Sequence, residues 1–175
     1  MISNHTIDAL LERRSIRAFR PEQISEEELA DLLYTAKFAP STMGLQERHF
    51  TVIQNKQLIQ DIIAAALRNG ADFGSSENPF YNAPTVIVFS AKEASLTGIE
   101  DAALAAMNLM IAAHAYGMGT CYIGSVTQGL RDKSIMERLK LPGGYLPVNC
   151  ISVGYPSEHA PAPIERRTDD VSYVR

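Results

Sequence analysis

The sequence predicts one mixed α/β or α+β domain. Three observations support this prediction: helical and strand patterns alternate along the chain, short connections join them, and one helical segment is apolar on every side. The chain has 175 residues, a formal net charge of −4 and 46% hydrophobic residues. That length suits a single hydrophobic core, and we expect residues 1–175 to form one domain.

Three helices and one strand are predicted in the first half of the chain. Thr6 is the expected N-cap of the first helix. Ser25 and Glu28 form a capping box that begins the second helix, and Pro40 favours an end near Phe38. The predicted elements are helices over about 6–14, from Ser25 to near Phe38 and over 56–68, and a strand over 49–54.

A buried strand and a polar loop stand out in the second half. Residues 70–84 are polar and contain Gly74, Pro79 and Pro84, so we expect a mobile loop or lid. The continuous apolar run over 85–91 is typical of a central strand that is buried on both faces. The remaining predicted elements are strands over 120–123 and 148–153, a helix over about 131–140, and an extended arm over 154–175.

Residues 99–116 form a predicted helix with almost no polar face. Alanine, leucine, methionine and isoleucine occupy nearly every position from Ala102 to Ala113. A helix that is apolar all round must be buried on all sides, and a domain this small can hardly supply that burial from one chain. We therefore expect a dimer whose subunits share this helix.

Composition and charge exclude several classes of partner. No basic tail or patch is present, so a nucleic-acid partner is not expected. The first residues lack the apolar core of a signal peptide, and no apolar run reaches membrane-spanning length, so we expect a soluble, cytoplasmic protein. Cys121 and Cys150 lie in apolar surroundings outside any CxxC spacing and are expected to be buried, reduced thiols. The histidines have no metal-ligand spacing, so no metal site is expected, and His114 is expected to be a buried or interface histidine.

A cluster of cationic and hydroxyl side chains near the N-terminus is the first candidate binding site. It consists of Arg13, Arg14, Ser15 and Arg17. Guanidinium groups bind phosphate bidentately and a serine hydroxyl adds a neutral donor, so the cluster suits a phosphate dianion. The alternative is a solvated charged turn at a helix end, where arginines also interact favourably with the helix dipole.

Three further segments supply loops and cations but no nucleophile. Residues 39–46 contain small hydroxylated residues and a glycine, which let backbone approach a flat ligand. Residues 117–124 contain GxG but not GxGxxG, and they precede a strand, so Gly117 is better explained as a helix C-cap and Gly124 as a strand end. Arginines on the arm either reach the same anion or are solvated.

The sequence contains no GxSxG, HExxH or P-loop motif. An enzyme that lacks reactive residues of its own often uses the chemistry of a cofactor.

Taken in order, four segments resemble the nitroreductase family of FMN-dependent oxidoreductases. They are LLERRSIRAF, APSTMGLQERHF, DAALAAMNLMIAAHAYGMGTCYIG and GYPSEHAPAPIERR, and together they extend over nearly the whole chain. The resemblance implies an α+β fold with a mixed, mainly antiparallel sheet flanked by helices. It also implies FMN as the cofactor and a homodimer with FMN at the subunit interface.

The resemblance further implies which residues bind FMN. The phosphate and the polar edge of the ring would be held by Arg13, Arg14, Ser15 and Arg17. The loop after the second helix would contact the partner subunit's flavin through Pro40, Ser41, Thr42 and Gly44. Backbone near the flavin N5 would come from Tyr122, Ile123 and Gly124. The arm would reach the phosphate through Arg166 or, in the alternative register, Arg167.

Two positions depart from the family's usual residues. Gly44 stands where the family commonly has asparagine, so one side-chain hydrogen bond in the flavin pocket is lost. Glu47 and Arg48 stand where the family commonly has a Pro-Trp pair. These departures affect the contacts of the ring more than flavin binding itself.

The implied function is an enzyme in which FMN carries the chemistry and no side chain is itself catalytic. NADH or NADPH would give hydride to N5 and leave, and a small electron-poor acceptor, such as a nitroaromatic or a quinone, would then take the electrons by a ping-pong mechanism. Arg17 would stabilise the negative charge that reduction places around N1 and C2=O.

Two alternatives to this function remain open. One is a specialised flavin enzyme on the same scaffold, such as a dehalogenase, ene-reductase or flavin-fragmenting enzyme. The other is a protein that senses or stores FMN without efficient turnover. A purely structural protein would not need arginines at both ends of the chain.

Overall fold

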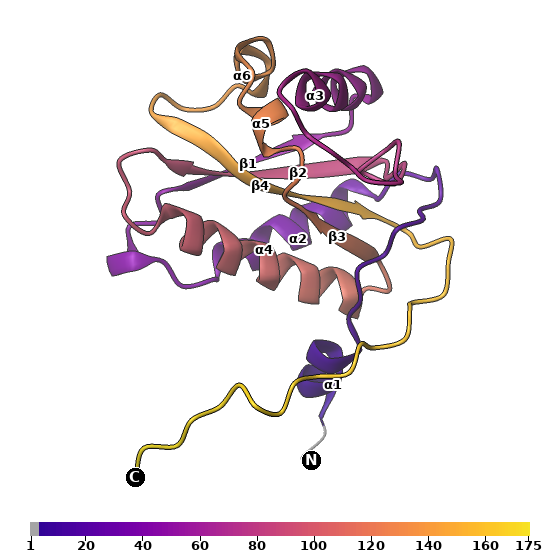
Figure 1. Cartoon of the computed structure of the whole chain (residues 1–175), viewed down its shortest axis with the longest axis vertical. Helices are drawn as coiled ribbons and strands as arrows, with labels where there is room; N and C mark the ends of the chain where they lie inside the picture. The colour runs from indigo at the N-terminus through magenta and orange to yellow at the C-terminus, as the bar shows by residue number, and fades with distance from the viewer. Residues whose placement is uncertain (1–3) are drawn as a thin grey trace.

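The computed structural model describes residues 4–175, which form a four-stranded sheet between two layers of helices (Figure 1). The strands are β1 (Arg48–Ile53), β2 (Thr85–Lys92), β3 (Gly119–Ile123) and β4 (Tyr145–Gly154), in the order β1-β2-β4-β3. One face of the sheet is covered by α3 (Lys56–Arg68), α5 (Thr127–Leu130) and α6 (Lys133–Leu139). The other is covered by α2 (Glu26–Lys37) and α4 (Gly98–Ala115). The remaining elements are α1 (His5–Glu12) and the short helix η1 (Thr42–Gly44).

The sheet confirms the predicted α+β class. All neighbouring strands pair antiparallel, and the parallel contribution is one bridge between Ser15 and Thr120 at the β3 edge. β2 lies between β1 and β4, and its residues are buried from Thr85 to Ala91. The apolar run therefore forms a central strand because both of its edges are paired and both of its faces are covered.

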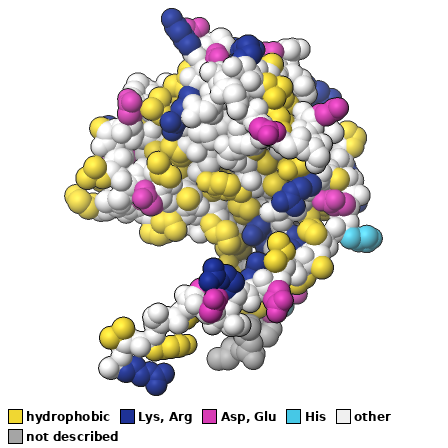
Figure 2. Space-filling model, in the orientation of Figure 1, with side chains coloured by type: hydrophobic (Ala, Val, Ile, Leu, Met, Phe, Trp, Pro, Cys, Tyr) yellow, Lys and Arg dark blue, Asp and Glu magenta, His cyan; other side chains and the backbone are white. Residues whose placement is uncertain are grey.

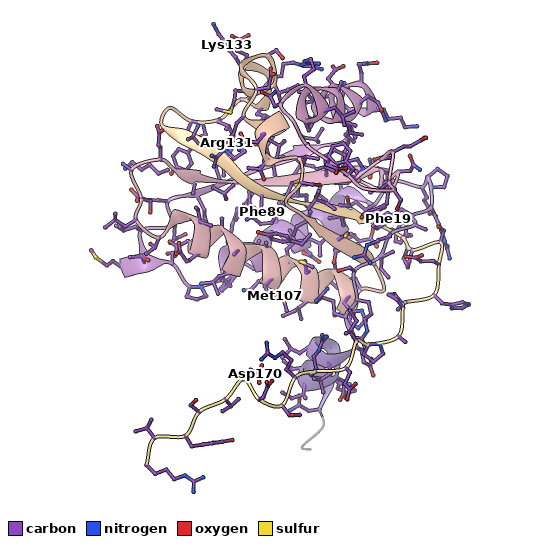
Figure 3. The ribbon with its side chains drawn as sticks, viewed as in Figure 1. Phe19, Phe89, Met107, Arg131, Lys133 and Asp170 are labelled. Atoms are coloured by element: carbon purple, nitrogen blue, oxygen red, sulfur yellow. The ribbon has the colours of Figure 1, made fainter. Side chains whose placement is uncertain are left out.

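The hydrophobic core has two parts, one on each face of the sheet. Ile62, Val88 and Leu130 belong to the part under α3, α5 and α6. Phe89 and Leu109 belong to the part between the sheet and α4, where Figure 3 shows Phe89 pointing toward that helix. α4 is thus buried along the side that faces the sheet.

Several predicted boundaries are confirmed. The Ser25–Glu28 capping box is present, Phe38 is the C-cap of α2, and α3 has the predicted limits 56–68. Gly117 has a φ of 75°, and the N–H groups of Gly117 and Met118 donate to carbonyls of the last turn of α4, as expected for a glycine that ends a helix. Within residues 4–175, no helix has the length and hydropathy needed to cross a membrane.

Two helix starts differ from the predictions. α1 is capped by Asn4 rather than Thr6, because the Asn4 side chain accepts a hydrogen bond from the Ile7 N–H at 3.0 Å. α6 begins two residues later than expected, because Asp132 caps it by accepting from the Ser134 N–H. The sequence patterns also left out α5 and η1, which are too short to show a helical period.

The predicted loop over 70–84 is irregular along its length, and its second half is anchored in the core. Phe80 is fully buried and Ala83 is nearly so. Ser152 of β4 donates a hydrogen bond to the Phe80 carbonyl at 3.1 Å. Movement of a lid is therefore a prediction only for residues 70–79.

Gly129 permits a close approach of α5 to α3. A Cβ atom at Gly129 would lie 2.6 Å from the backbone nitrogen of Ala66 and 2.7 Å from the carbonyl oxygen of Ile62. Because backbone atoms of a buried helix cannot move aside easily, we expect Gly129→Ala to destabilise the protein by about 1–3 kcal/mol in urea unfolding. Gly143→Ala is the matched control, since its Cβ would meet nothing within 4 Å. Equal stability of the two variants would contradict this interpretation.

Candidate functional site

Residues 13–17, which we call the arginine segment, lie along the edge of the sheet that β3 forms. The Ile16 N–H donates to the Thr120 carbonyl at 3.0 Å, next to the Ser15–Thr120 bridge. Gly119 makes this approach possible, because a Cβ there would lie 2.9 Å from the Cβ of Ile16. The backbone of the segment is therefore fixed by a strand whose own register is set by β4.

The chain that follows β4 lies on the other side of the same segment. The Ser157 N–H donates to the Ala18 carbonyl at 3.0 Å, and the Arg17 N–H donates to the Glu158 carboxylate at 2.6 Å. Glu158 was not among the predicted site residues. No sequence pattern could have indicated it, because it is 141 residues away from Arg17 along the chain.

A cationic cavity of about 190 Å³ opens between these segments and the end of α4. It is lined by Arg13, Arg14, Ile16, His114, Gly117, Met118, Thr120, Pro156, Glu158 and Ala160. Nε and Nη1 of Arg13 are buried without a hydrogen-bond partner. Burial lowers the pKa of Arg13, and the positive charges of Arg14 and Arg166 lower it further. Buried N–H groups without a partner are costly, and an anion in the cavity would satisfy both of them.

The other predicted cations differ in how they are placed. Nη1 of Arg14 donates to the carbonyls of Leu11 and Arg13, at 2.6 and 2.8 Å, and so closes the end of α1. The arm lines this cavity through Pro156, Glu158 and Ala160, and the charge of Arg166 contributes least to the lowered pKa of Arg13. Arg167 instead forms an exposed ion pair with Asp169 at 2.9 Å. Contact of either arginine with a phosphate stays a prediction.

Arg17 faces the loop over 70–84. Its guanidinium lies 6.0 Å from the centre of the Tyr81 ring, within cation–π range. Tyr81 and Asn82 have φ values of 56° and 58°, in the left-handed region. Arg17 and Phe19 line an open, polar cavity of about 510 Å³ with this loop. The loop thus lies against Arg17, whose backbone N–H also donates to Glu158 of the arm.

Both cysteines are buried and free, as predicted. Burial raises the pKa of Cys121, although the charge of Arg17 and a hydrogen bond from Ser15 oppose the shift. Burial also raises the pKa of Cys150. Neither thiol is a thiolate near pH 7, so neither is an activated nucleophile.

The predicted turn after β3 is confirmed as a strand end. Tyr122 is 44% exposed, while Ile123 is buried in the core beside α5. Gly124 is exposed, and its carbonyl accepts a hydrogen bond from the Thr127 hydroxyl at 2.8 Å. A planar ligand that lies against this turn would meet backbone rather than a bulky side chain at Gly124.

The loop with Pro40, Ser41, Thr42 and Gly44 lies at the opposite end of α4 from the cationic cavity. The Thr42 N–H donates to Asp101 in the first turns of α4, whereas His114 of the cavity belongs to its last turn. Asp101 and His114 are 13 residues apart on α4, so the two groups of predicted residues are separated by about 20 Å along the helix, and Figure 1 shows the short helix η1 at the opposite end of α4 from the segment that follows α1. One chain does not bring them together.

The fold and site define an α+β protein with a cationic cavity beside an edge strand. Residues 10–155 match the model of the Nitroreductase family, so the chain belongs to that family. A nitroreductase with bound FMN from Desulfitobacterium hafniense DCB-2 is 26% identical, with a TM-score of 0.90 over 99% of this chain and 100% of that chain. An FMN-dependent nitroreductase from Clostridium difficile R20291 is 30% identical, with a TM-score of 0.87 over 98% of this chain and 99% of that chain. An FMN reductase (NADPH) from Bacillus subtilis is 28% identical over 88% of this chain and 67% of its own.

Proposed function

We propose that the protein binds FMN and uses it to pass reducing equivalents from NADH or NADPH to a small electron-poor acceptor, such as a nitroaromatic or a quinone. The observation that carries this proposal is the guanidinium of Arg13, whose Nε and Nη1 are buried and unpaired, in a chain that belongs to the Nitroreductase family and is similar to a nitroreductase with bound FMN. The phosphate of FMN has a charge near −2, which matches the cluster of cations around the cavity. The relatives named as FMN reductase and FMN-dependent nitroreductase support the same reaction class.

The chain's own residues would bind and orient the flavin. Arg13 and Arg166 would hold the phosphate, Ser15 would add a neutral donor, and Arg17 would face the pyrimidine edge of the ring. Bound FMN would supply the hydride chemistry at N5. Tyr122, Ile123 and Gly124 would exclude water from that edge. Arg17 would also stabilise negative charge on the ring, because it can approach the N1 side from the edge of the sheet.

We infer that the functional unit is a homodimer. Ile99, Leu104 and Met107 of α4 are 64%, 44% and 36% exposed, and Figure 3 shows Met107 on the side of α4 that faces away from the sheet. Figure 2 shows hydrophobic side chains gathered along the lower part of the body, where Figure 1 places α4. Leu10 and Leu11 of α1 add 41% and 53% exposed side chains. An apolar surface of this kind is typical of a subunit interface.

A two-fold pairing through α4 would also complete the site. If two copies of α4 pack antiparallel, the loop over 40–44 at one end of the helix lies near the partner's cationic cavity at the other end. Pro40, Ser41, Thr42 and Gly44 would then contact the partner's flavin. Gly44 has a φ of 70°, a conformation that glycine and asparagine tolerate best, so the departure at this position keeps the path of the backbone.

A steady-state assay of the FMN-loaded protein tests this function. We expect oxidation of NADH or NADPH that depends on the added quinone or nitroaromatic. Double-reciprocal plots at several acceptor concentrations should give parallel lines, because the two substrates would use one site in turn. If neither nicotinamide reduces the bound flavin, the enzyme proposal is wrong and flavin storage or sensing becomes the better explanation.

A further inference from the structure

The loop between α2 and β1 has a strained backbone. Met43, Gly44 and Gln46 have φ values of 52°, 70° and 53°. A residue other than glycine costs about 1 kcal/mol or more in this region, and such conformations persist only where the surroundings hold them. The side chains of Met43 and Leu45 are 86% and 56% exposed, so their packing within this chain contributes little. Polar contacts must therefore hold the loop.

Arg48 holds the first end of the loop. Its Nη2 donates to the carbonyls of Lys37 and Ala39 at 2.8 and 2.7 Å, and its Nη1 donates to the carbonyl of Pro40 at 3.0 Å. These carbonyls belong to the end of α2 and to the first residues of the loop, where helix carbonyls lack partners within the helix. The planar guanidinium can satisfy all of them at once, which a lysine ammonium on a flexible stem cannot do equally well.

Asp101 holds the middle of the loop. It is 5% exposed, and its two carboxylate oxygens lie 3.2 and 3.1 Å from the Thr42 nitrogen, which donates to them. The Thr42 hydroxyl also hydrogen-bonds the Thr97 hydroxyl at the start of α4. The negative charge of Asp101 acts on Arg48 and raises its pKa, against the larger lowering caused by burial. The two side chains thus form a charge-coupled clamp around residues 39–42.

We propose that Arg48 and Asp101 are positioning residues that hold this loop in the shape in which its backbone meets the partner's flavin. This inference rests on the proposed function, because it takes the loop to contact FMN across the dimer. The clamp would replace, by hydrogen bonds, the constraint that a Pro-Trp pair could supply at the same place. Loss of the clamp should therefore loosen the loop and weaken flavin binding without changing any residue that touches the phosphate.

Titration of the apoprotein with FMN, followed by flavin fluorescence, tests this role. We expect Arg48→Ala to raise the dissociation constant of FMN at least tenfold and to shift the visible absorption maximum of the bound flavin. Arg48→Lys should recover only part of the affinity, and Asp101→Asn should weaken binding several-fold. Arg138→Ala is the matched control, because Arg138 pairs with Asp61 on the opposite face of the sheet and should leave the affinity within twofold.

The outcomes separate the clamp from the function on which it rests. A wild-type protein that does not bind FMN contradicts the proposed function. A wild-type protein that binds FMN, together with an Arg48→Ala variant of equal affinity and equal flavin spectrum, overturns the clamp alone, even if the melting temperature of the variant is lower. If Arg48→Ala does not fold, Arg48→Lys decides the question in the same titration, and an affinity within twofold of wild type overturns the proposal.

Discussion

Replacing Arg13 with alanine is expected to weaken FMN binding about 100-fold, which corresponds to about 2.7 kcal/mol. The guanidinium lies in the cationic cavity with Nε and Nη1 buried and unpaired, so the phosphate would be the partner that offsets its desolvation. Truncation of one member of a buried charge pair leaves the other unpaired, which accounts for an effect of this size. Fluorescence titration of the apoprotein with FMN measures it.

The stability of the apoprotein separates this explanation from general damage to the fold. Without ligand, Nε and Nη1 of Arg13 are buried without a partner, so removal of this side chain should leave the free energy of unfolding unchanged or raise it. Arg138→Ala again serves as the control, because it removes a half-exposed arginine from α6. An Arg13→Ala variant that binds FMN as tightly as wild type would place the phosphate elsewhere.

Met107→Glu is expected to convert the proposed dimer to a monomer at micromolar concentration. Met107 is 36% exposed on the outer side of α4, in the middle of the apolar surface that would pair with the partner. Burial of an unpaired carboxylate there would cost several kcal/mol, more than a dimer of moderate affinity can lose. Sedimentation velocity measures the change, and FMN affinity should fall with it because the partner's loop is lost.

Leu67→Glu is the matched control for the dimer. Leu67 is 53% exposed on α3, which lies on the opposite face of the sheet, so the added charge should leave the dimer and its flavin intact. A Met107→Glu variant that remains dimeric would mean that the subunits do not pair through the outer side of α4. A wild-type monomer that binds FMN fully would contradict the shared site.

The elements that the sequence predicted well are those with a strong local cause. The run over 85–91 could only be a doubly buried strand, and the capping box at Ser25 and Glu28 fixed the start of α2 by its own hydrogen bonds. The cap of α1 had no such cause: Thr6 was expected, but Asn4 lies two residues earlier and its side chain can also cap a helix. α5 is held by its contact with α3 rather than by a pattern of its own.

The sequence predicted those parts of the candidate site in which a ligand requires particular kinds of side chain close together along the chain. The cluster at 13–17 stood out because several cations and a hydroxyl suit a phosphate, and the structure places it on the cavity that the arm also reaches. Glu158 and Asp101 act through backbone groups that lie far away along the chain, so no spacing indicates them. Arg48 stood out in the sequence only as a departure from the family, whereas the structure shows what it holds.

The absorption spectrum of the protein purified without added flavin tests FMN binding most directly, followed by titration of any apoprotein with FMN. The cationic cavity and the family predict a yellow protein that takes up about one FMN per chain and is bleached by NADH or NADPH. A colourless protein that does not respond to added FMN would contradict both the cofactor and the reaction, and would leave the fold as the only point of agreement with the family.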